Sequence, residues 1–577
     1  MERRVLLAVV LSFVVLYGYS VMFPAQKPGE PKPAQPSKLA TAPNASAPGP
    51  ANPTPSVQGL PAEATPGVPA AAARDIVVEN NDVRAVFTTR GAVIKSWQLK
   101  RYRDNLGRPY EFVAGHAPAD APLPLTLGVD DAALARTLAS APFTVSSESG
   151  TGASGWQARF DYNAGGVAVQ KTLSITPDKP YVVHVTATVT RDGQQVPSII
   201  RWGPALGRGI TPKASYATYN PPIQPIYYRD GNVKRVKPDQ IAAQPTAEGS
   251  FGFVGVDDHY FLAALVRPQQ PVRVDYAPVS VTVQDVPEGA HYVSWSARFP
   301  GPAQNAAFFA GPKDFDVLAA VDRELVRAID FGMFSWLVVP LLRALKWING
   351  YVGNYGWSLI ILTILINLAM FPLRHKSVVS MRKMQEVQPE VKAIQDRYKN
   401  LKMSDPARGK MNQELMALYK ERGVNPASGC VPMLLTMPFI FAFYALLSTA
   451  IELRGAPWFG WIHDLSAHDP YYVVPVLMGA SQVWQQRLAP AAGMDPIQQK
   501  MMLLMPVFFT YLFLWYPSGV ALYWFVNNVW AIGQQYATNY MIGPPPNIQP
   551  TKGTAGERRM KRVGGSKTDA AARDKQP

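Results

Sequence analysis

Five apolar segments in the last two fifths of the 577-residue chain constrain its fold more than any other feature. They cover residues 357–373, 429–450, 471–487, 501–516 and 518–538, and each has about 16–22 residues, close to the length of a transmembrane helix. Backbone groups in hydrocarbon must be paired within the segment, which an α-helix achieves. The sequence therefore predicts a five-span helical membrane core within residues 353–542.

The N-terminal third begins with two segments of unusual composition. Arg3 and Arg4 precede 18 mostly apolar residues without a good small-residue cleavage site, which favours an uncleaved anchor helix over residues 1–23 rather than a signal peptide. Residues 24–73 contain 13 Pro and 13 Ala. This segment cannot bury enough apolar surface to fold, so we expect an extended linker.

Residues 74–324 have the alternating pattern of short strands. "YVVHVTATVT" and "HYVSWSARF" alternate apolar and polar residues, and Gly-containing turns separate such runs. The pattern predicts an all-β sandwich with no disulfide framework, since Cys430 is the only cysteine of the chain. "GVDDHYF", with His259, is interpreted as a turn entering a strand rather than a catalytic group. Residues 325–352 predict an amphipathic helix at the membrane surface, and the alternative is a further span.

The distribution of charge predicts the orientation in the membrane. Residues 374–422 hold twelve Lys/Arg against six Asp/Glu, and residues 551–577 hold eight against three, whereas residues 450–470 hold one against three. Basic loops stay in the cytoplasm. We therefore expect a cytoplasmic loop at 374–425, a basic cytoplasmic tail at 543–577, both termini inside, and the β-domain outside.

The cytoplasmic loop has a helical apolar spacing. Apolar residues recur three or four apart and resume after a break, which predicts a helical hairpin with an apolar seam formed by Met384, Val387, Val391, Ile394, Tyr398, Met411, Leu415 and Leu418. The sequence leaves two interpretations open. The hairpin is either a solvated connection between two spans or a docking arm for a ribosome or a targeting factor.

Uncharged polar residues recur inside the apolar segments. Thr363 and Asn367 are four apart, so they share one helix face near mid-span. A single polar residue in a span is usually a contact between helices, but several such stripes favour a shared polar cavity. The spans contain no titratable pair for proton coupling, and the chain has no nucleotide motif and no metal-ligand cluster. This pattern favours a device that uses no cofactor and is not an enzyme.

Several stretches resemble the YidC membrane protein insertase family in its Gram-negative form, with a large periplasmic domain. They include "FFAGPKD" at 308–314, "GNYGWSLIILTILINLAMFPL" at 353–373, "GVNPASGCVPMLLTMPFIFAFYALL" at 423–447 and "DPIQQKMMLLMPVFFTYLFLWYPSGVALYWFVNN" at 495–528. The resemblance covers essentially the whole chain. It implies a multi-pass inner-membrane protein with a periplasmic β-supersandwich.

The resemblance also implies an activity, partners and site residues. The chain would be an insertase and chaperone that binds nascent membrane proteins in a hydrophilic groove and releases their spans laterally into lipid, alone or with the Sec translocon. Ribosomes, signal-recognition targeting factors and anionic lipids would be further partners, without a nucleic-acid substrate. The implied groove residues are Thr363, Asn367, Thr436, Gln482, Gln485, Tyr523, Trp524 and Asn527. The implied cytoplasmic docking residues are Arg382, Lys383, Lys392, Arg397, Lys399, Arg408, Lys410, Arg558, Arg559, Lys561 and Arg562.

One position departs from the family pattern. The family usually has a basic residue where this chain has Asn367. An amide can hydrogen-bond but cannot attract a charge over distance, so electrostatic capture of acidic client segments is not expected to carry over. Arg374 lies further along, and we place it in the cytoplasmic loop. On this view Asn367→Arg would help acidic clients most.

Two other functions fit parts of the sequence. A small-molecule transporter with a periplasmic capture domain predicts inverted repeats and an intramembrane charge site, and neither is recognisable. A structural anchor for a functional β-domain predicts loss of function when about residues 60–310 are deleted. An insertase should tolerate much of that deletion.

Overall fold

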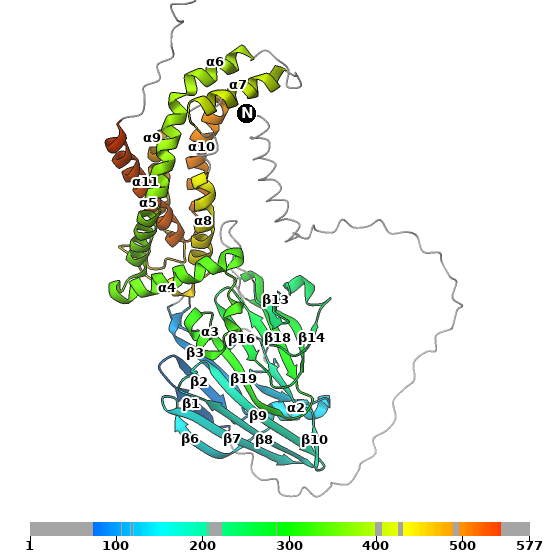
Figure 1. Ribbon diagram of the computed structural model, residues 1–577. Coiled ribbons are helices and arrows are strands. Elements are labelled where there is room, and N and C mark those ends of the chain that lie inside the picture. Colours follow the sequence, from blue (N-terminus) through cyan, green and yellow to red (C-terminus); the bar gives the residue numbers. More distant parts are fainter. Residues whose placement is uncertain are drawn as a thin grey trace, which may run out of the picture. The chain divides into compact units, whose positions relative to one another are not determined.

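The computed structural model of the chain (Figure 1) describes residues 73–104, 107–115, 117–118, 121–204, 206, 222–283, 286–398, 407–424, 431–488 and 496–543. The predicted anchor, nearly all of the linker and most of the basic tail lie outside these ranges. The chain forms two compact units. The described residues within 394–418 belong to the smaller unit, and all other described residues belong to the larger one.

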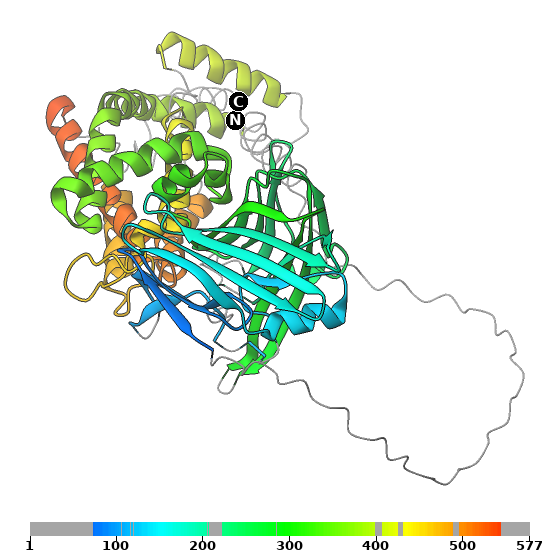
Figure 2. The same ribbon diagram turned by 90° about the horizontal axis from the view of Figure 1, so that it is seen from below.

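Within the described part of residues 73–321, three antiparallel sheets form the β-domain (Figures 1 and 2). The first has the order β1 (Asp75–Glu79), β2 (Val83–Thr88), β3 (Val93–Arg103), β4 (Pro109–Glu111). The second has the order β13 (Asn232–Arg235), β12 (Gln224–Arg229), β15 (Phe253–Asp257), β16 (Phe261–Val266), β19 (Ala303–Pro312), β9 (Val182–Arg191), β8 (Val167–Ile175), β7 (Gly155–Ala164), β6 (Thr144–Thr151), with β10 (Gln194–Val196) paired to β9. The third has the order β14 (Thr246–Gly249), β17 (Val272–Val283), β18 (Val286–Arg298), β11 (Ile199–Trp202), β5 (Thr126–Gly128).

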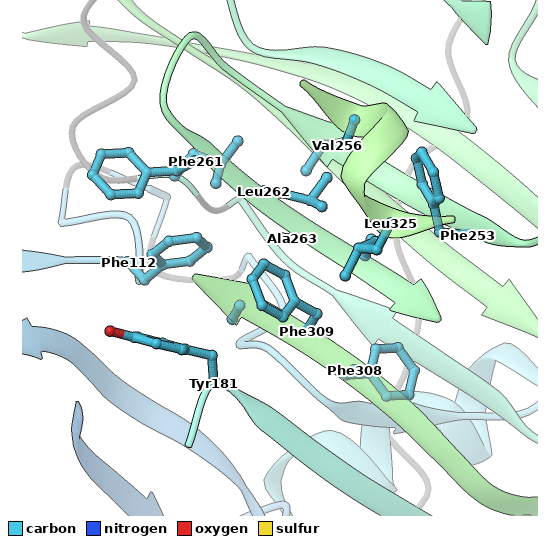
Figure 3. Close-up of a cluster of buried hydrophobic side chains, with 14 of the residues drawn as sticks. Phe112, Tyr181, Phe253, Val256, Phe261, Leu262, Ala263, Phe308, Phe309 and Leu325 are labelled. Atoms are coloured by element: carbon cyan, nitrogen blue, oxygen red, sulfur yellow. The ribbon is translucent and has the colours of Figure 1, made fainter. Parts of the chain in front are cut away.

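The sheets bury a continuous aromatic and aliphatic core. Strand β9 alternates buried and more exposed positions, as a strand with one face on the core should. All six residues of β16 are buried, because both of its faces are covered. Figure 3 shows side chains of β15, β16 and β19, including Phe253, Phe261 and Phe308, gathered in this core.

The all-β expectation is wrong in detail, because helix α2 (Ala132–Ser140) lies between β5 and β6. Asp131 caps it by accepting hydrogen bonds from the backbone N–H groups of Ala133 and Leu134. The helix buries Ala135 and Leu138. Nine residues are too few to show a clear helical period in a region dominated by strands, so the sequence pattern did not reveal this helix.

The helical region follows the β-domain. Its elements are α3 (Phe315–Val321), the 3-10 turns η2 (Leu325–Ala328) and η3 (Gly332–Phe334), α4 (Ser335–Val352), α5 (Tyr355–Glu386), α6 (Gln388–Arg397), α7 (Ala407–Glu421), α8 (Val431–Thr449), the turn η5 (Ile451–Leu453), α9 (Val473–Leu488), α10 (Pro496–Phe513) and α11 (Ser518–Ile542). The predicted interfacial helix therefore begins at Ser335 rather than at residue 325. Helix α5 continues to Glu386, past the predicted end of the span at residue 373.

Membrane-crossing length is clear for one helix within the described ranges. Residues Tyr355–Met384, 30 residues of α5, are long and apolar enough to cross a bilayer. The apolar stretches Met437–Thr449 and Leu504–Phe513 are shorter. The structure thus gives a β-rich domain and a helical C-terminal region, while the five-span core stays a prediction.

Three side chains tie the β-domain to the helical region. Lys346 on α4 forms ion pairs with Asp314, Asp316 and Glu452. Arg454, after η5, lies 4.9–5.4 Å from the rings of Tyr110, Tyr260 and Phe261. His259 Nε2 lies 2.7 Å from the Ser448 carbonyl oxygen at the end of α8.

The β15–β16 connection carries His259 and is a turn, as the sequence indicated. The Asp258 side chain accepts hydrogen bonds from the backbone N–H groups of Tyr260 and Phe261. Burial lowers the pKa of His259 to about 4. The ring is therefore neutral near pH 7, and Nε2 can donate its proton to the Ser448 carbonyl.

A lysine is buried in the β-domain without a carboxylate partner among the residues that the structure describes. Lys171 on β8 is fully buried, and its Nζ donates to the carbonyl oxygens of Ala92 and Leu125, each at 2.6 Å. Both of these residues have positive φ. The lysine thus cross-links two left-handed turns, and burial lowers its pKa to about 7.

The lysine predicts a pH dependence of the β-domain's stability. An unfolded Lys has a pKa of about 10.4, so between about pH 7 and 10 the unfolded state holds a proton that the folded state has released. The free energy of unfolding should therefore rise with pH across this window. Lys171→Met should remove the rise, and exposed Lys237→Met should keep it. Urea unfolding followed by tryptophan fluorescence checks this, and an unchanged slope in Lys171→Met would contradict it.

Candidate functional site

A cavity of about 310 Å³ lies among helices α5, α8, α9 and α11. Five of the eight predicted groove residues line it: Thr363, Asn367, Gln485, Tyr523 and Asn527. Gln534 and Gln535 add polar groups, and Phe439, Ile440 and Phe443 form an apolar wall. The Phe443 and Tyr523 rings stack at 4.3 Å and fix that wall.

The polar face of α5 is a ladder of hydrogen bonds. The Thr363 hydroxyl donates to the Leu359 carbonyl at 2.7 Å, and the Asn367 amide donates to the Thr363 carbonyl at 2.8 Å. Each polar group therefore has a partner on its own helix, although Thr363 and Asn367 are 0% and 3% exposed. These bonds leave the Asn367 Oδ1 oxygen as an acceptor that faces the cavity.

The hydrogen bond to this acceptor oxygen comes from Arg374. Its Nη1 donates to Asn367 Oδ1 at 2.6 Å, and the side chain lines the cavity. Helical side chains point toward the N-terminus of their helix, and residues seven apart share a face, so a long side chain at 374 reaches back to 367. Sequence reasoning grouped Arg374 with the cytoplasmic loop and did not connect its side chain with Asn367. The spacing 363, 367, 374 was the signal that sequence reasoning missed.

The cavity has a single sign of charge. Its described lining includes Arg374 and contains no Asp or Glu. The cation is therefore held by a neutral amide rather than neutralised by a carboxylate, and Arg has five donors, of which the Asn367 bond uses one. The cavity can accept water, hydroxyl and amide groups, and it favours an anionic group.

Two predicted groove residues, Trp524 and Gln482, have other surroundings. Trp524 packs on Phe509 and Phe513 at ring distances of 6.1 and 5.4 Å, between α10 and α11. Gln482 does not line the cavity, and its Oε1 atom is buried without a hydrogen-bond partner in the described structure. The Thr436 side chain lies outside the described residues.

Some of the predicted docking residues are exposed, one is buried, and the others lie outside the described residues. Lys383, Lys392, Arg397 and Lys410 are exposed on α5, α6 and α7. Arg382 is buried, and it donates to the Asn539 side chain and the Gly543 carbonyl at the end of α11. Lys399 and the tail residues Arg558, Arg559, Lys561 and Arg562 lie outside the described residues, as does the Arg408 side chain.

Four residues of the predicted apolar seam are buried, two in each unit. Val387 and Val391 are buried in the larger unit, and Ile394 and Leu415 are buried in the smaller one. Within the smaller unit the Tyr398 hydroxyl donates to Glu414 at 2.8 Å, and Arg397 pairs with the same carboxylate at 3.1 Å.

The fold and the cavity together define a class: a protein with a β-rich domain and a helical region, in which helices, one of them long enough to cross a membrane, line a charged polar cavity. The two parts match two family models. Residues 75–344 match the YidC periplasmic domain, and residues 347–544 match the 60Kd inner membrane protein.

Individual relatives match over nearly the full length. The membrane protein insertase YidC of Geobacter metallireducens is 36% identical, covering 94% of this chain and 99% of the relative. That of Syntrophus aciditrophicus is 35% identical, covering 93% and 99%. A solved structure, an active YidC insertase with the first transmembrane domain resolved, is 19% identical with a TM-score of 0.33, covering 80% of this chain and 92% of that chain.

The chain belongs to the YidC membrane protein insertase family, which confirms the resemblance seen in the sequence. It is an inner-membrane protein with a periplasmic domain, and its activity is the insertion of nascent membrane proteins. Members of this family are insertases and not enzymes.

Two adjacent asparagines on α11 have different surroundings: one bonds to α9, and the other lines the cavity. Asn528 Nδ2 donates to Ser481 Oγ at 3.1 Å and to the Met478 carbonyl at 3.3 Å on α9, whereas Asn527 lines the cavity. Interhelical hydrogen bonds in membranes contribute about 0.6 kcal/mol on average and up to about 1.7. Asn528→Ala should lower the free energy of unfolding in detergent by that amount. Asn527→Ala should lower it less, and the reverse order would contradict the assignment.

Proposed function

We propose that this insertase holds the polar segment of a nascent membrane protein in the cavity while the adjacent apolar segment enters lipid. The proposal rests on one observation: Arg374, tethered by Asn367, places an uncompensated cation among helices of the membrane region. Ionisable groups in such a place are expensive and are commonly functional. Thr363, Asn367, Gln485, Tyr523 and Asn527 would provide the polar contacts.

The proposed topology sets the depth of the cavity. Helices α5, α8, α9, α10 and α11 would cross the bilayer, with residues 1–23 as a sixth span, the β-domain in the periplasm, and both termini in the cytoplasm. Support comes from the length of α5 and from the charge of the connecting segments. Thr363 lies eight residues from the start of α5, about 12 Å at 1.5 Å per residue, and Arg374 about 28 Å.

This depth explains how insertion would proceed without an energy source. The stretch from Thr363 to Arg374 covers about 16 Å of a hydrocarbon core of about 30 Å. A polar client segment in the cavity would be dehydrated over the remaining half only. Transfer of the client's apolar span into lipid then supplies the driving force.

Exposed basic side chains on α5, α6 and α7 support a docking role. Lys383, Lys392, Arg397 and Lys410 would meet ribosomal RNA or anionic lipid headgroups, which are negatively charged, or a targeting factor. Cooperation with the Sec translocon on larger clients belongs to the same proposal. Arg382 is not available for docking, because its guanidinium is hydrogen-bonded to Asn539 and Gly543 at the end of α11.

The charge at Arg374 can be tested against a neighbour. Arg374→Gln should impair insertion of clients with acidic polar segments about tenfold, since a hydrogen bond to a charged group is worth about 1.5–3 kcal/mol. Clients with neutral segments should change less. Lys376→Gln removes an exposed charge two residues away and serves as the control. Insertion of matched acidic and neutral clients into vesicles containing each variant provides the measurement.

Equal losses for acidic and neutral clients would remove the electrostatic part of the proposal. Asn367→Leu should act in the same direction as Arg374→Gln, because it releases the guanidinium from its acceptor. Asn367→Arg is no longer expected to help, since it would place two cations side by side.

A further inference from the structure

The connection between α8 and α9, residues 450–472, turns its charged side chains inward. The structure describes this whole segment, which contains four charged residues. The Glu452 side chain is only 5% exposed and forms an ion pair with Lys346 of α4. Arg454 is half-buried, and its guanidinium lies over aromatic rings of the β-domain. Both of these charges are therefore used inside the protein.

The two aspartates of the connection are used in the same way. Asp469 is fully buried, and its carboxylate accepts hydrogen bonds from Trp461 Nε1 at 2.9 Å and from the backbone N–H of Val474 at 2.8 Å. The Asp464 carboxylate accepts a hydrogen bond from the Ser466 hydroxyl at 2.7 Å. Acidic and basic side chains are mostly exposed in proteins, and a connection surrounded by water would be expected to expose them. Within residues 450–472, however, no charged residue is among the exposed ones.

The surface that the connection exposes is aromatic and uncharged. Phe459, Tyr471 and Tyr472 are 64%, 69% and 39% exposed. The remaining exposed residues of the segment are Gly455, Pro457, Gly460, His463, Ala467, His468 and Pro470. Tyr and His have an apolar body and a polar tip, which suits a boundary between a polar and an apolar phase. The exposed chemistry of this connection is thus that of a membrane–water interface.

Contacts with α5 fix the level at which the connection lies. The Trp458 ring lies 5.8 Å from the ring of Trp357, in the first turn of α5, and Asn354 Nδ2 donates to the Trp458 carbonyl at 3.1 Å. A Cβ on Gly356 would lie 2.2 Å from the Trp458 ring, so this ring packs directly against the backbone of α5. Helix α5 is long and apolar enough to cross a bilayer. The connection therefore lies at the level of one end of that helix.

Further exposed aromatic side chains lie at the same end of α5. Trp357 itself is 46% exposed. Trp347 and Tyr351 lie in the last part of α4, which leads into α5, and they are 64% and 77% exposed. Trp and Tyr are enriched where membrane proteins meet lipid headgroups. The exposed aromatic residues of the connection thus continue a surface that begins on α4 and α5.

We propose that the α8–α9 connection docks on phospholipid headgroups, with Phe459, Tyr471 and Tyr472 inserted at the boundary between the headgroups and the acyl chains. The inference rests on the proposed crossing of the bilayer by α5. It adds a membrane contact for a segment whose charge indicates only the side of the membrane on which it lies.

The surface favours lipid over a protein partner. It has no exposed charge that could fix the register of a protein contact. It also continues into the exposed apolar residues Val476 and Leu477 of α9, directly after Tyr472. A surface that passes without a break from aromatic to aliphatic residues matches the change from headgroups to hydrocarbon.

The contact would set the depth of the polar cavity in the bilayer. The connection holds the beginnings of three helices: Trp458 packs on α5, Asp469 bonds to the start of α9, and the Ser518 N–H at the start of α11 donates to the Ala467 carbonyl at 2.7 Å. These three helices line the cavity. A connection anchored in the headgroups therefore fixes the height of the cavity walls relative to the lipid.

Fluorescence quenching in vesicles tests the docking. A bimane probe is attached to a single cysteine at 459, 471, 368 or 237 in the full-length Cys430→Ser protein, in vesicles of phosphatidylcholine and phosphatidylglycerol. Bromine atoms on the acyl chains, near the headgroup or near the chain end, quench from the lipid, and iodide quenches from the water. Leu368 is 56% exposed on α5 and reports the proposed span, and Lys237, exposed in the β-domain, reports water.

We expect shallow bromines to quench the probe at 459 and at 471 several-fold more strongly than the probe at 237. Deep bromines should quench best at 368, and iodide should quench best at 237. Iodide quenching at 459 and 471 equal to that at 237, with lipid quenching kept at 368, would overturn the docking and leave the proposed crossing intact. Shielding of 459 and 471 from both quenchers would also overturn it, since a second copy of the chain would then cover the surface. Lipid quenching at none of the three positions 368, 459 and 471 would reject the crossing and the docking together.

Substitution of Phe459 tests its part in the contact. With the probe at 471, Phe459→Asp places a charge at the boundary with the acyl chains, so shallow-bromine quenching should fall several-fold and iodide quenching should rise. Phe459→Leu keeps an apolar side chain and serves as the matched control. The melting temperature in detergent identifies a folding defect in either variant. Unchanged quenching in a folded Phe459→Asp protein would overturn the role of this residue.

Discussion

The hydrogen bond between Asn367 and Arg374 holds a cation at the polar cavity of the helical region. A polar group among apolar helices must have a partner, and this chain meets that requirement by a ladder from Leu359 through Thr363 and Asn367 to Arg374. Through these bonds, groups of helix α5 hold the Arg374 guanidinium in place. The lining described around it has no carboxylate, so the charge is not neutralised there.

In the β-domain, basic side chains among apolar groups also have partners, but of other kinds. Lys171 is buried against two backbone carbonyls, and Arg454 lies among three aromatic rings. Each basic side chain joins neighbouring segments: the first joins two left-handed turns, and the second joins the β-domain to the segment after α8. These two groups organise structure, whereas Arg374 lines a cavity of about 310 Å³.

Sequence reasoning found the parts of the site that follow a short periodicity. Thr363 and Asn367, or Tyr523 and Asn527, are four apart and were readily placed on common faces. Arg374 was missed because we grouped it with the charged residues of the loop that follow it. Its spacing of seven residues from Asn367 nevertheless places it on the same helix face. Asn527 and Asn528 are adjacent and identical, so no pattern could show that one lines a cavity and the other bonds to α9.

The sequence by itself determined the family, the β-rich and helical parts of the chain, and the polar faces of the helices, because alternation, apolar runs and spacing depend on local geometry. It did not determine helix α2, the burial of Arg382 or the pairing of α5 with α11. Those were decided by the tertiary structure, because they depend on which faces meet across long separations in the chain.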